Sequence, residues 1–467
     1  MHAADGWTGW KKGPDLLNNC PTYTPSGWVP AKTHGWYSTM LEYDGTPGTP
    51  FLYEMGFSQG YQVNVQLRKG EILVRNWSNI GLCMENAPGC LNLKTTDSNL
   101  AYSATMFGDL SNGRVGNGTL EYIVPLESSE FQKSALLAEN LASKHDDRND
   151  PALHVKDADK DGVLVIRMPS SYVYLTGQAN FKTVVEKGGE IQLFLSDNNG
   201  LDWKEVQKIN ASGSQTVDLK RFVYRRYDYR LKFVLKGKGT GLDSLSITHD
   251  IQHSQRPLPA LGQGENKIAF SSGTEGTITI EGSHCQDAVG KQLLVSDFHP
   301  TANNVTITPE IRLTAPKGEL TFPVETPGDM TRIRFGLSGR VHDKNDLWNL
   351  QVSFNDGKTF KTVDTLKGPA RFASKWVTAN DIPAGTRKAL VRYAGENAAA
   401  AMIFNFRIDA DYKEPAGEFA PIKITYTWTE NGKDVQDTHI ASHAEDSYTI
   451  KCDGKPTMKS IALELSE

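Results

Sequence analysis

Short segments that alternate apolar and polar residues, separated by Gly and Pro, set the strongest limit on how this chain can fold. Between residues 151 and 256 no convincing helix interrupts them: GVLVIRM, YVYL, GEIQLFLS, WKEVQKI, QTVDL, YDYRLKFVLKG and LDSLSITHDI. A period of two is typical of strands with one buried face, and strands of this length favour an antiparallel β-sandwich such as a jelly roll. We therefore predict an all-β fold, and the 42 Gly and 22 Pro residues agree with its many turns.

The 467 residues are too many for one ordinary domain, and a typical domain length of about 150 suggests roughly three. We expect an aromatic- and Gly-rich N-terminal β domain, a linker or short helix, and two tandem jelly-roll or Ig-like sandwiches. A C-terminal hairpin with strands completes or follows the second sandwich. The expected boundaries are 1–130, 131–150, 151–260, 261–415 and 416–467. GTLEYIVPL (118–126) is expected to close the first domain, the segment 135–143 has the best helical composition, and Asn431-Gly432 predicts a hairpin turn.

The stretch SDNNGLDW, from Ser196 to Trp203, nearly matches the Asp box of sialidases and other β-propellers, but Asn198 stands in the Asp position. The stretch SFNDGKTF aligns with it when Ser353 is placed on Ser196, and the shift between the two is the length of a whole domain. Propeller boxes would recur with every blade, about every 40–50 residues. We therefore interpret both stretches as hairpin turns in two copies of one sandwich. In such a turn Asn bonds to nearby backbone, Gly takes a positive φ and the aromatic residue packs underneath.

The segment KDADKDG places Asp157, Asp159 and Asp161 before Gly162, the spacing with which an oxygen-lined calcium loop begins. The last ligand position of an EF-hand would fall on Met168, which cannot bind calcium, and the segment that follows reads as a strand. An EF-hand is therefore excluded. A looser structural Ca²⁺ site and a plain acidic surface turn both stay open, and no other cofactor is expected.

Catalytic motifs are missing from the sequence. HDIQH, from His249 to His253, superficially resembles the zincin motif, but it follows an alternating strand, along which four residues span about 13 Å. Two His side chains so far apart cannot share one metal ion. The chain has no GxSxG, P-loop, GxGxxG or HExxH, and no carboxylate pair stands out for glycoside hydrolysis. The sequence therefore leans away from an enzyme and identifies no catalytic residue.

The segment YRRYDYRLKF separates two kinds of side chain. One face carries Tyr227, Tyr229, Leu231 and Phe233, and the other carries Arg226, Asp228, Arg230 and Lys232. The plain interpretation is a half-buried strand with a charged solvent face. The alternative is a basic face on which Arg226 and Arg230 bind a sulfated or carboxylated polysaccharide.

Aromatic residues gather near the N-terminus, and sugar rings stack on exposed aromatic faces. The candidates for such stacking are Trp28, Trp36, Tyr37 and Tyr43. In a Gly-rich segment the same residues also serve as core plugs, so both interpretations stay open.

The chain has five Cys residues, and two of them, Cys83 and Cys90, bracket the short loop CMENAPGC. A local disulfide and two free thiols are both compatible with that spacing. The other three are isolated, and we expect them to be buried thiols.

The net charge of −5 gives no global electrostatic case for a nucleic acid or an anionic membrane as partner. No apolar run is long enough to span a membrane. The N-terminus, MHAADGWTGWKKG, lacks the apolar region of a signal peptide, and we expect a mature or excised segment of a secreted or cell-surface protein. A polysaccharide or cell-envelope glycan is the expected partner, and a homo-oligomer stays open.

Several phrases resemble a group of large, mostly uncharacterised secreted bacterial proteins: HGWYSTMLEYDG, NGTLEYIVPL, ALHVKDADKDGVLVIRMPSSYVYL, SDNNGLDWKEV, YRRYDYRLKF and GLDSLSITHDIQHSQRPLPALGQGEN. In that group similar sandwiches follow a transglutaminase-like segment with a Cys/His/Asp site. The resemblance covers roughly residues 34 to 410 and implies the non-catalytic C-terminal part of such a protein. No matching Cys-His-Asp segment is present, so no catalytic residue is carried over.

The preferred function is a non-catalytic array of β-sandwiches, secreted or at the cell surface, that binds or organises polysaccharide or other cell-envelope material. One alternative is a carbohydrate-active enzyme, a glycoside hydrolase or lyase, with its site in the N-terminal domain. The other is a self-assembling surface or fibre component.

Overall fold

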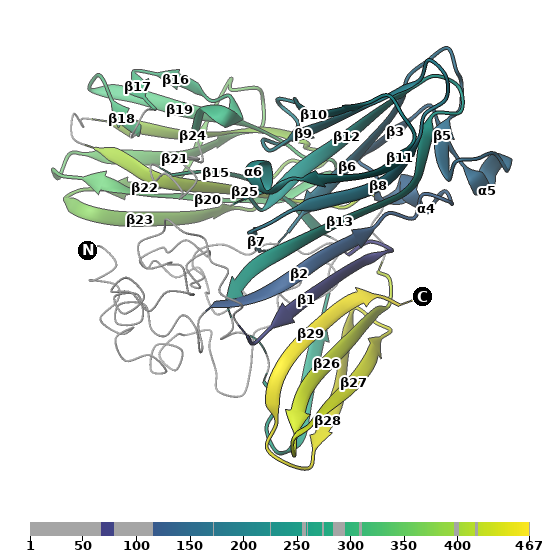
Figure 1. Cartoon of the computed structure of the whole chain (residues 1–467). Helices are drawn as coiled ribbons and strands as arrows, with labels where there is room; N and C mark the ends of the chain where they lie inside the picture. Colours follow the sequence, from purple (N-terminus) through teal and green to yellow (C-terminus); the bar gives the residue numbers. More distant parts are fainter. Residues whose placement is uncertain are drawn as a thin grey trace, which may run out of the picture.

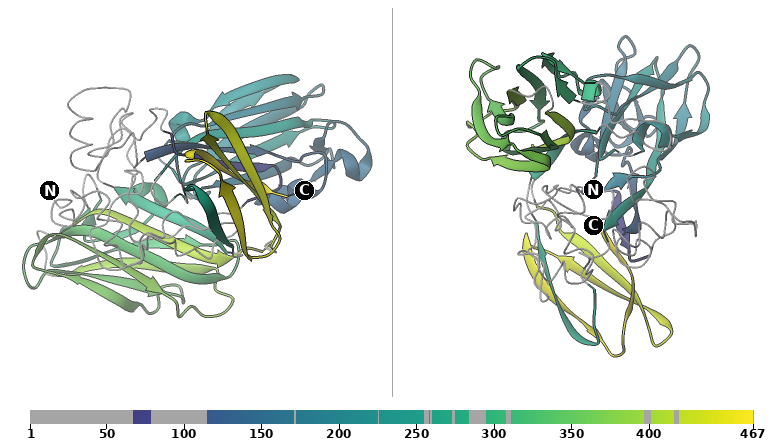
Figure 2. Two further views of the ribbon diagram at one scale, coloured as in Figure 1. Left: turned by 90° about the horizontal axis from the view of Figure 1, so that it is seen from below. Right: turned by 90° about the vertical axis from the view of Figure 1, so that its left-hand side faces the viewer.

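The structure is a computed structural model that describes residues 67–466 apart from 79–114, 171, 225, 255–257, 259, 273–274, 284–294, 308–310, 397–400 and 416–418. In that part of the chain almost all regular structure is β, and the strands pair antiparallel. The predicted all-β fold is confirmed. Two sandwiches lie side by side, and a smaller β unit lies below them (Figures 1 and 2).

The first sandwich contains most of the blue and teal elements of Figure 1. In chain order they are β2 (Val115–Ile123), α4 (Glu130–Ser134), β3 (Leu137–Glu139), β4 (Leu141–Ser143), α5 (Lys144–Asp147), β5 (Leu153–Val155), β6 (Gly162–Pro169), β7 (Val173–Tyr174), β8 (Gln178–Val184), β9 (Glu190–Ser196), β10 (Lys204–Ile209), β11 (Gly213–Asp218), α6 (Lys220–Val223), β12 (Asp228–Lys236) and β13 (Gly241–Ser254). One sheet has the order β10-β9-β12-β6-β3, and the other contains β11-β8-β13-β2, with β5 and β7 also paired to β13. We call the first of these the small sheet and the second the large sheet.

Two expectations differ from the structure here. The strand expected to close the N-terminal domain is β2, which pairs with β13 over its whole length, so the first sandwich begins at Val115. The segment 135–143, for which a short helix and an extended linker were both open, forms β3 and β4, which pair with β6 and β5. Pairing with the strands that follow it in the sequence overrides a weak local helix preference, which is worth only tenths of a kcal/mol per residue.

The second sandwich is drawn in green in Figure 1. Its elements are β15 (Glu275–Ser283), η4 (Val295–Phe298), β16 (Thr301–Asn303), β17 (Val305–Thr306), β18 (Ile311–Leu313), β19 (Lys317–Glu325), β20 (Met330–Val341), β21 (Leu347–Ser353), β22 (Lys361–Lys367), β23 (Ala370–Ala379), β24 (Lys388–Glu396) and β25 (Met402–Lys413). Its small sheet has the order β22-β21-β24-β19-β16, and its large sheet has β23-β20-β25, with β15 and β18 also paired to β25. The strand order therefore repeats that of the first sandwich, and β21 takes the place of β9.

The C-terminal tail pairs away from the second sandwich. Its strands and their partners are β1 (Glu71–Asn76), β14 (Gly264–Ser271), β26 (Ile422–Glu430), β27 (Lys433–Ala441), β28 (Glu445–Cys452) and β29 (Thr457–Leu465). The order β2-β1-β29-β26-β27 extends the large sheet of the first sandwich, and β14 pairs with β28. The predicted hairpin is present, because Asn431 and Gly432 join β26 to β27 with φ values of 52° and 75°.

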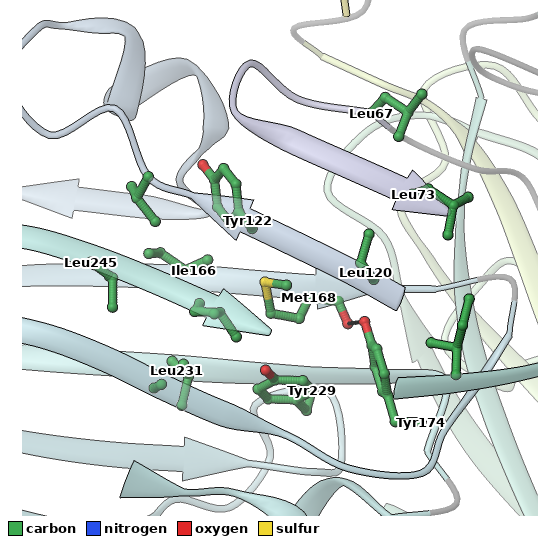
Figure 3. Close-up of a cluster of buried hydrophobic side chains, with 14 of the residues drawn as sticks. Leu67, Leu73, Leu120, Tyr122, Ile166, Met168, Tyr174, Tyr229, Leu231 and Leu245 are labelled. Carbon is green, nitrogen blue, oxygen red and sulfur yellow. Dashed lines mark hydrogen bonds between the residues drawn. The ribbon is translucent and has the colours of Figure 1, made fainter. Parts of the chain in front are cut away.

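Alternation along the strands produces the cores. Every second side chain of β9 and β12 is buried. Figure 3 shows how Leu120 from β2, Ile166 and Met168 from β6, and Leu231 from β12 point into the space between the two sheets. This core continues into the C-terminal unit, whereas the second sandwich has a core of its own.

Candidate functional site

Two of the residues that the sequence suggested for ligand binding lie at strand β12: Arg226 just before its start, and Arg230 within it. The inner face of the strand is as predicted, because Tyr229, Leu231 and Phe233 are buried; Tyr227, just before the strand, is also buried, with Arg407 of the second sandwich 4.4 Å from its ring centroid. The other face is not a solvent face at its start, since Arg226 and Asp228 are only 2% and 8% exposed. Arg226 Nη2 pairs with Asp297 of the second sandwich at 3.4 Å, and Asp228 pairs with Arg167, which itself contacts that sandwich. The expected basic surface is therefore wrong at this end of the strand, and Arg226 lies in a junction between sandwiches.

Arg167 on β6 is the centre of that junction. Its Nε donates to Asp228 Oδ2 at 2.8 Å, and its Nη1 donates to the Tyr412 hydroxyl at 2.7 Å. Its Nη2 donates to the carbonyl oxygen of Thr277. Burial works to lower the pKa of Arg167, but Asp228 and Tyr412 outweigh it, so the pKa lies above its usual value. The guanidinium is therefore held charged between two strands of one sandwich and two of the other.

The junction closes an exposed strand edge. Among the described residues, β15 pairs only with β25, which leaves its other edge without a neighbouring strand. Side chains of the first sandwich cap that edge, because Arg167 and Asn199 donate to the carbonyl oxygens of Thr277 and Thr279, the second at 3.0 Å. An uncovered edge offers a template for pairing with other chains. By covering this edge, the first sandwich prevents β15 from pairing with a strand of another chain.

The near-Asp-box turn between β9 and β10 is part of the same junction. As predicted, it is a hairpin turn in which Asn198 Oδ1 accepts from the backbone N–H of Asp202 at 3.0 Å and Gly200 has a φ of 84°. Asn198 Nδ2 also donates to the carbonyl oxygen of Asp297 in the second sandwich, at 2.7 Å. Burial lowers the pKa of Arg230, which lies against Gly200, to about 10. The turn is thus a docking element as well as a hairpin.

The second copy of this turn, between β21 and β22, has the same internal hydrogen bonds, and the described residues show no bond from Asn355 to the first sandwich. Asn355 Oδ1 accepts from the backbone N–H of Thr359 at 3.0 Å, and Gly357 has a φ of 79°. Asn355 is exposed, whereas Asn198 is 3% exposed. Both copies carry Asn at this position, so nothing in the local sequence could have shown that only the first one docks.

A second group of buried charges lies on the outer face of the large sheet of the second sandwich. Asp411 Oδ1 accepts from Arg334 Nη2 at 2.8 Å and from the Thr277 hydroxyl at 2.6 Å, and Asp411 also pairs with Arg332. Burial works to raise the pKa of Asp411, but Arg334 and Arg332 outweigh it, so the pKa lies below its usual value. Asp409 pairs in the same way with the Thr279 hydroxyl at 2.7 Å. The threonines whose carbonyl oxygens are capped are thus also fixed through their hydroxyls.

The predicted calcium ligands do not converge. No group of His, Cys, Asp or Glu within the described ranges is placed to hold a metal ion, and this includes Asp157, Asp159 and Asp161. Their turn is held by Asn140, whose Oδ1 accepts from the backbone N–H of Asp157 and whose Nδ2 donates to its carbonyl oxygen, both at 2.9 Å. Asn140 thus holds the backbone of this acidic turn in place.

His249 lies on strand β13, as the sequence predicted, and is 2% exposed. Its Nε2 accepts from the Tyr229 hydroxyl at 2.7 Å, and its Nδ1 faces the carbonyl oxygen of Leu120 at 3.3 Å. Since a carbonyl can only accept, Nδ1 carries the proton. Burial lowers the pKa of His249 to about 3, so the ring is a neutral core residue.

The remaining candidates are placed as follows. Cys452 is a buried free thiol. The other candidates fall outside the residues that the structure describes: Trp28, Trp36, Tyr37, Tyr43, Cys83 and Cys90. None of the helices in the described ranges is long and apolar enough to cross a membrane.

Comparison with known proteins adds little beyond this geometry. No protein-family model matches the chain, and no curated protein sequence matches it. A solved structure of isomalto-dextranase from Arthrobacter globiformis, complexed with panose, matches 55% of this chain and 35% of its own at 11% identity and a TM-score of 0.17. Allantoicase from Saccharomyces cerevisiae matches 62% and 93% of the two chains at 10% identity and a TM-score of 0.19. Latent PorU from Porphyromonas gingivalis matches 64% and 31% at 7% identity and a TM-score of 0.21. Scores this low support no inference about activity, and the conclusion that stands is the fold, an all-β chain of antiparallel sandwiches.

Proposed function

We propose that this chain is a non-catalytic multi-sandwich module, secreted or at the cell surface, that presents binding surfaces for polysaccharide or cell-envelope material on a rigid scaffold. The observation that carries the proposal is the junction built around Arg167. Arg167 is held by its ion pair with Asp228 in the first sandwich and donates across the junction to Tyr412 and Thr277, so a different orientation of the two sandwiches would break these hydrogen bonds. A scaffold needs that property, whereas a flexible linker between sandwiches would not provide it.

The repeated plan supports the same proposal. The two sandwiches share one strand order, and their hairpin turns share one set of internal hydrogen bonds. We propose that they are two copies of one domain type, of which the first acquired a docking function. The resemblance to the C-terminal sandwiches of large secreted bacterial proteins agrees with a module that acts beside a catalytic segment and not in place of it.

A paired binding and release assay tests the function. The whole chain is incubated with a panel of insoluble and soluble polysaccharides, and both retained protein and newly formed reducing ends are measured over time. We expect retention on at least one polysaccharide with no increase in reducing ends. Release of reducing ends by the native chain but not by the heat-denatured chain would show an enzyme, and the absence of retention on every member would remove the glycan partner.

A further inference from the structure

Lys232 lies on the outer face of the small sheet of the first sandwich. It follows Arg230 by two residues on β12 and therefore lies on the same face. Its Nζ is 4.2 Å from the ring centroid of Trp203 and 4.8 Å from that of Phe194. All three side chains are partly exposed. No carboxylate within the described ranges forms an ion pair with Lys232. The junction with the second sandwich therefore reaches along β12 as far as Arg230. The next residue on that face, Lys232, contacts two aromatic rings instead.

The second sandwich shows what is missing around this lysine. Lys232 pairs in register with Phe194, and at the matching place Arg392 pairs with Gln351. Arg392 also stacks on an aromatic ring, with its Cζ 3.5 Å from the ring centroid of Phe360, but it is neutralised by Glu319 at 2.9 Å.

Strand register identifies the residue that replaces this carboxylate. Lys232 lies opposite Val165, and Arg392 lies opposite Thr321. Two positions before these residues, the second sandwich has Glu319 where the first has Val163. The first sandwich thus keeps the cation and the aromatic ring but lacks the carboxylate.

Lys232 forms no ion pair among the described residues, and Glu205, on the same row of the sheet, lies beyond Phe194 on β10. Burial lowers the pKa of Lys232, and nothing in its surroundings raises it. Aromatic faces attract the ammonium group, but a carboxylate or sulfate would form a stronger, charge-assisted hydrogen bond. Two apolar side chains in this part of the fold are also exposed: Leu201 in the turn before Trp203 by 43%, and Leu137, which lies opposite Val165 on the next strand, by 40%. A ligand that fits combines an anionic group with a ring that has apolar C–H faces.

We propose that Lys232, Trp203 and Phe194 form a binding surface for an acidic polysaccharide. The carboxylate or sulfate of one sugar unit pairs with Lys232, and the sugar ring packs against the aromatic side chains and their apolar margin. This inference rests on the proposed function as a binding module and names the ligand class and the surface. It also separates the basic residues of this face: Arg226 and Arg230 lie in the junction, and Lys232 binds the ligand.

Titration of the whole chain with defined polymers tests the surface. The probes are polygalacturonate for a carboxylated chain, dextran sulfate for a sulfated one, dextran as a neutral polymer and poly-glutamate as an acidic peptide. We expect binding to at least one acidic polysaccharide, weaker binding at high salt, and little binding to dextran or poly-glutamate. The variant K232Q should bind about tenfold more weakly, the loss expected when one charge-assisted hydrogen bond is removed.

The matched control is K208Q, because Lys208 lies on β10 of the same sheet but is already paired with Glu190. We expect K208Q to bind like the unmodified chain. Equal affinities of K232Q and the unmodified chain would overturn the proposal, as would the absence of binding to both acidic polysaccharides. Equal binding of poly-glutamate would overturn the assignment to a sugar. If other glycans are retained in the panel assay but K232Q does not change binding, the proposed function as a glycan-binding module is kept and this binding surface is rejected.

Discussion

Replacement of Arg167 by methionine should weaken the junction more than any change at an exposed ion pair. The substitution keeps an unbranched side chain but removes the donors to Asp228, Tyr412 and Thr277. Asp228 is 8% exposed and would remain buried without this partner. Removal of one member of a buried ion pair costs about 3–5 kcal/mol. We therefore expect the free energy of unfolding of R167M to fall by that amount.

The assay is urea-induced unfolding of the full chain, followed by tryptophan fluorescence and by circular dichroism. The double variant R167M/D228N should recover part of the loss, because it leaves no buried charge unpaired, and the cycle measures the coupling between the two residues. The control is K182A, which breaks a pair with Asp243 whose side chains are 58% and 31% exposed and should cost about 0–1 kcal/mol. If R167M loses no more stability than K182A, the buried pair of Arg167 and Asp228 does not contribute as argued and our reasoning fails.

Two further predictions follow from buried groups. The variant N198A should lose about 1 kcal/mol more than N355A in the same unfolding assay, because only Asn198 also donates to Asp297 across the junction; equal losses would mean that the docking bond contributes nothing. Burial lowers the pKa of His249 to about 3, below the unfolded value of about 6.5. The contribution of the neutral ring to the free energy of unfolding is therefore complete above pH 6.5 and is lost as the pH falls towards 3. Within that range the loss is about 1.4 kcal/mol per pH unit. Between pH 6 and pH 4 the stability of H249Q should therefore fall less steeply than that of the unmodified chain, and parallel curves would contradict the assigned pKa.

The alternation of apolar and polar residues predicted much of the fold, but it did not predict which surfaces of the two sandwiches contact each other. The pattern of β12 identified its buried face, because a period of two assigns alternate side chains to opposite sides of a sheet. It could not show what covers the other face, since Arg167 and its partner Tyr412 are 245 positions apart. The same holds for β2, which pairs with β13, a strand more than a hundred residues further along the chain.

The candidate ligand surface illustrates the same limit. The sequence placed Arg226, Arg230 and Lys232 on one face and suggested only the two arginines as ligand-binding residues. Only the position of the second sandwich divides them, and only the internal comparison shows that Val163 stands where Glu319 neutralises the matching cation. Such differences depend on strand register between segments far apart in the chain, which one sequence read locally does not contain.

The relative orientation of the two sandwiches tests the central claim most directly. Spin labels attached through an unnatural ketone amino acid at Ser214 on β11 and Lys367 on β22, both exposed, would leave all five cysteines in place. Pulsed electron paramagnetic resonance then measures the distribution of distances between them. We predict one narrow distribution for the chain with an intact junction and a broader one for R167M. A broad distribution with the junction intact would contradict the account of a rigid scaffold.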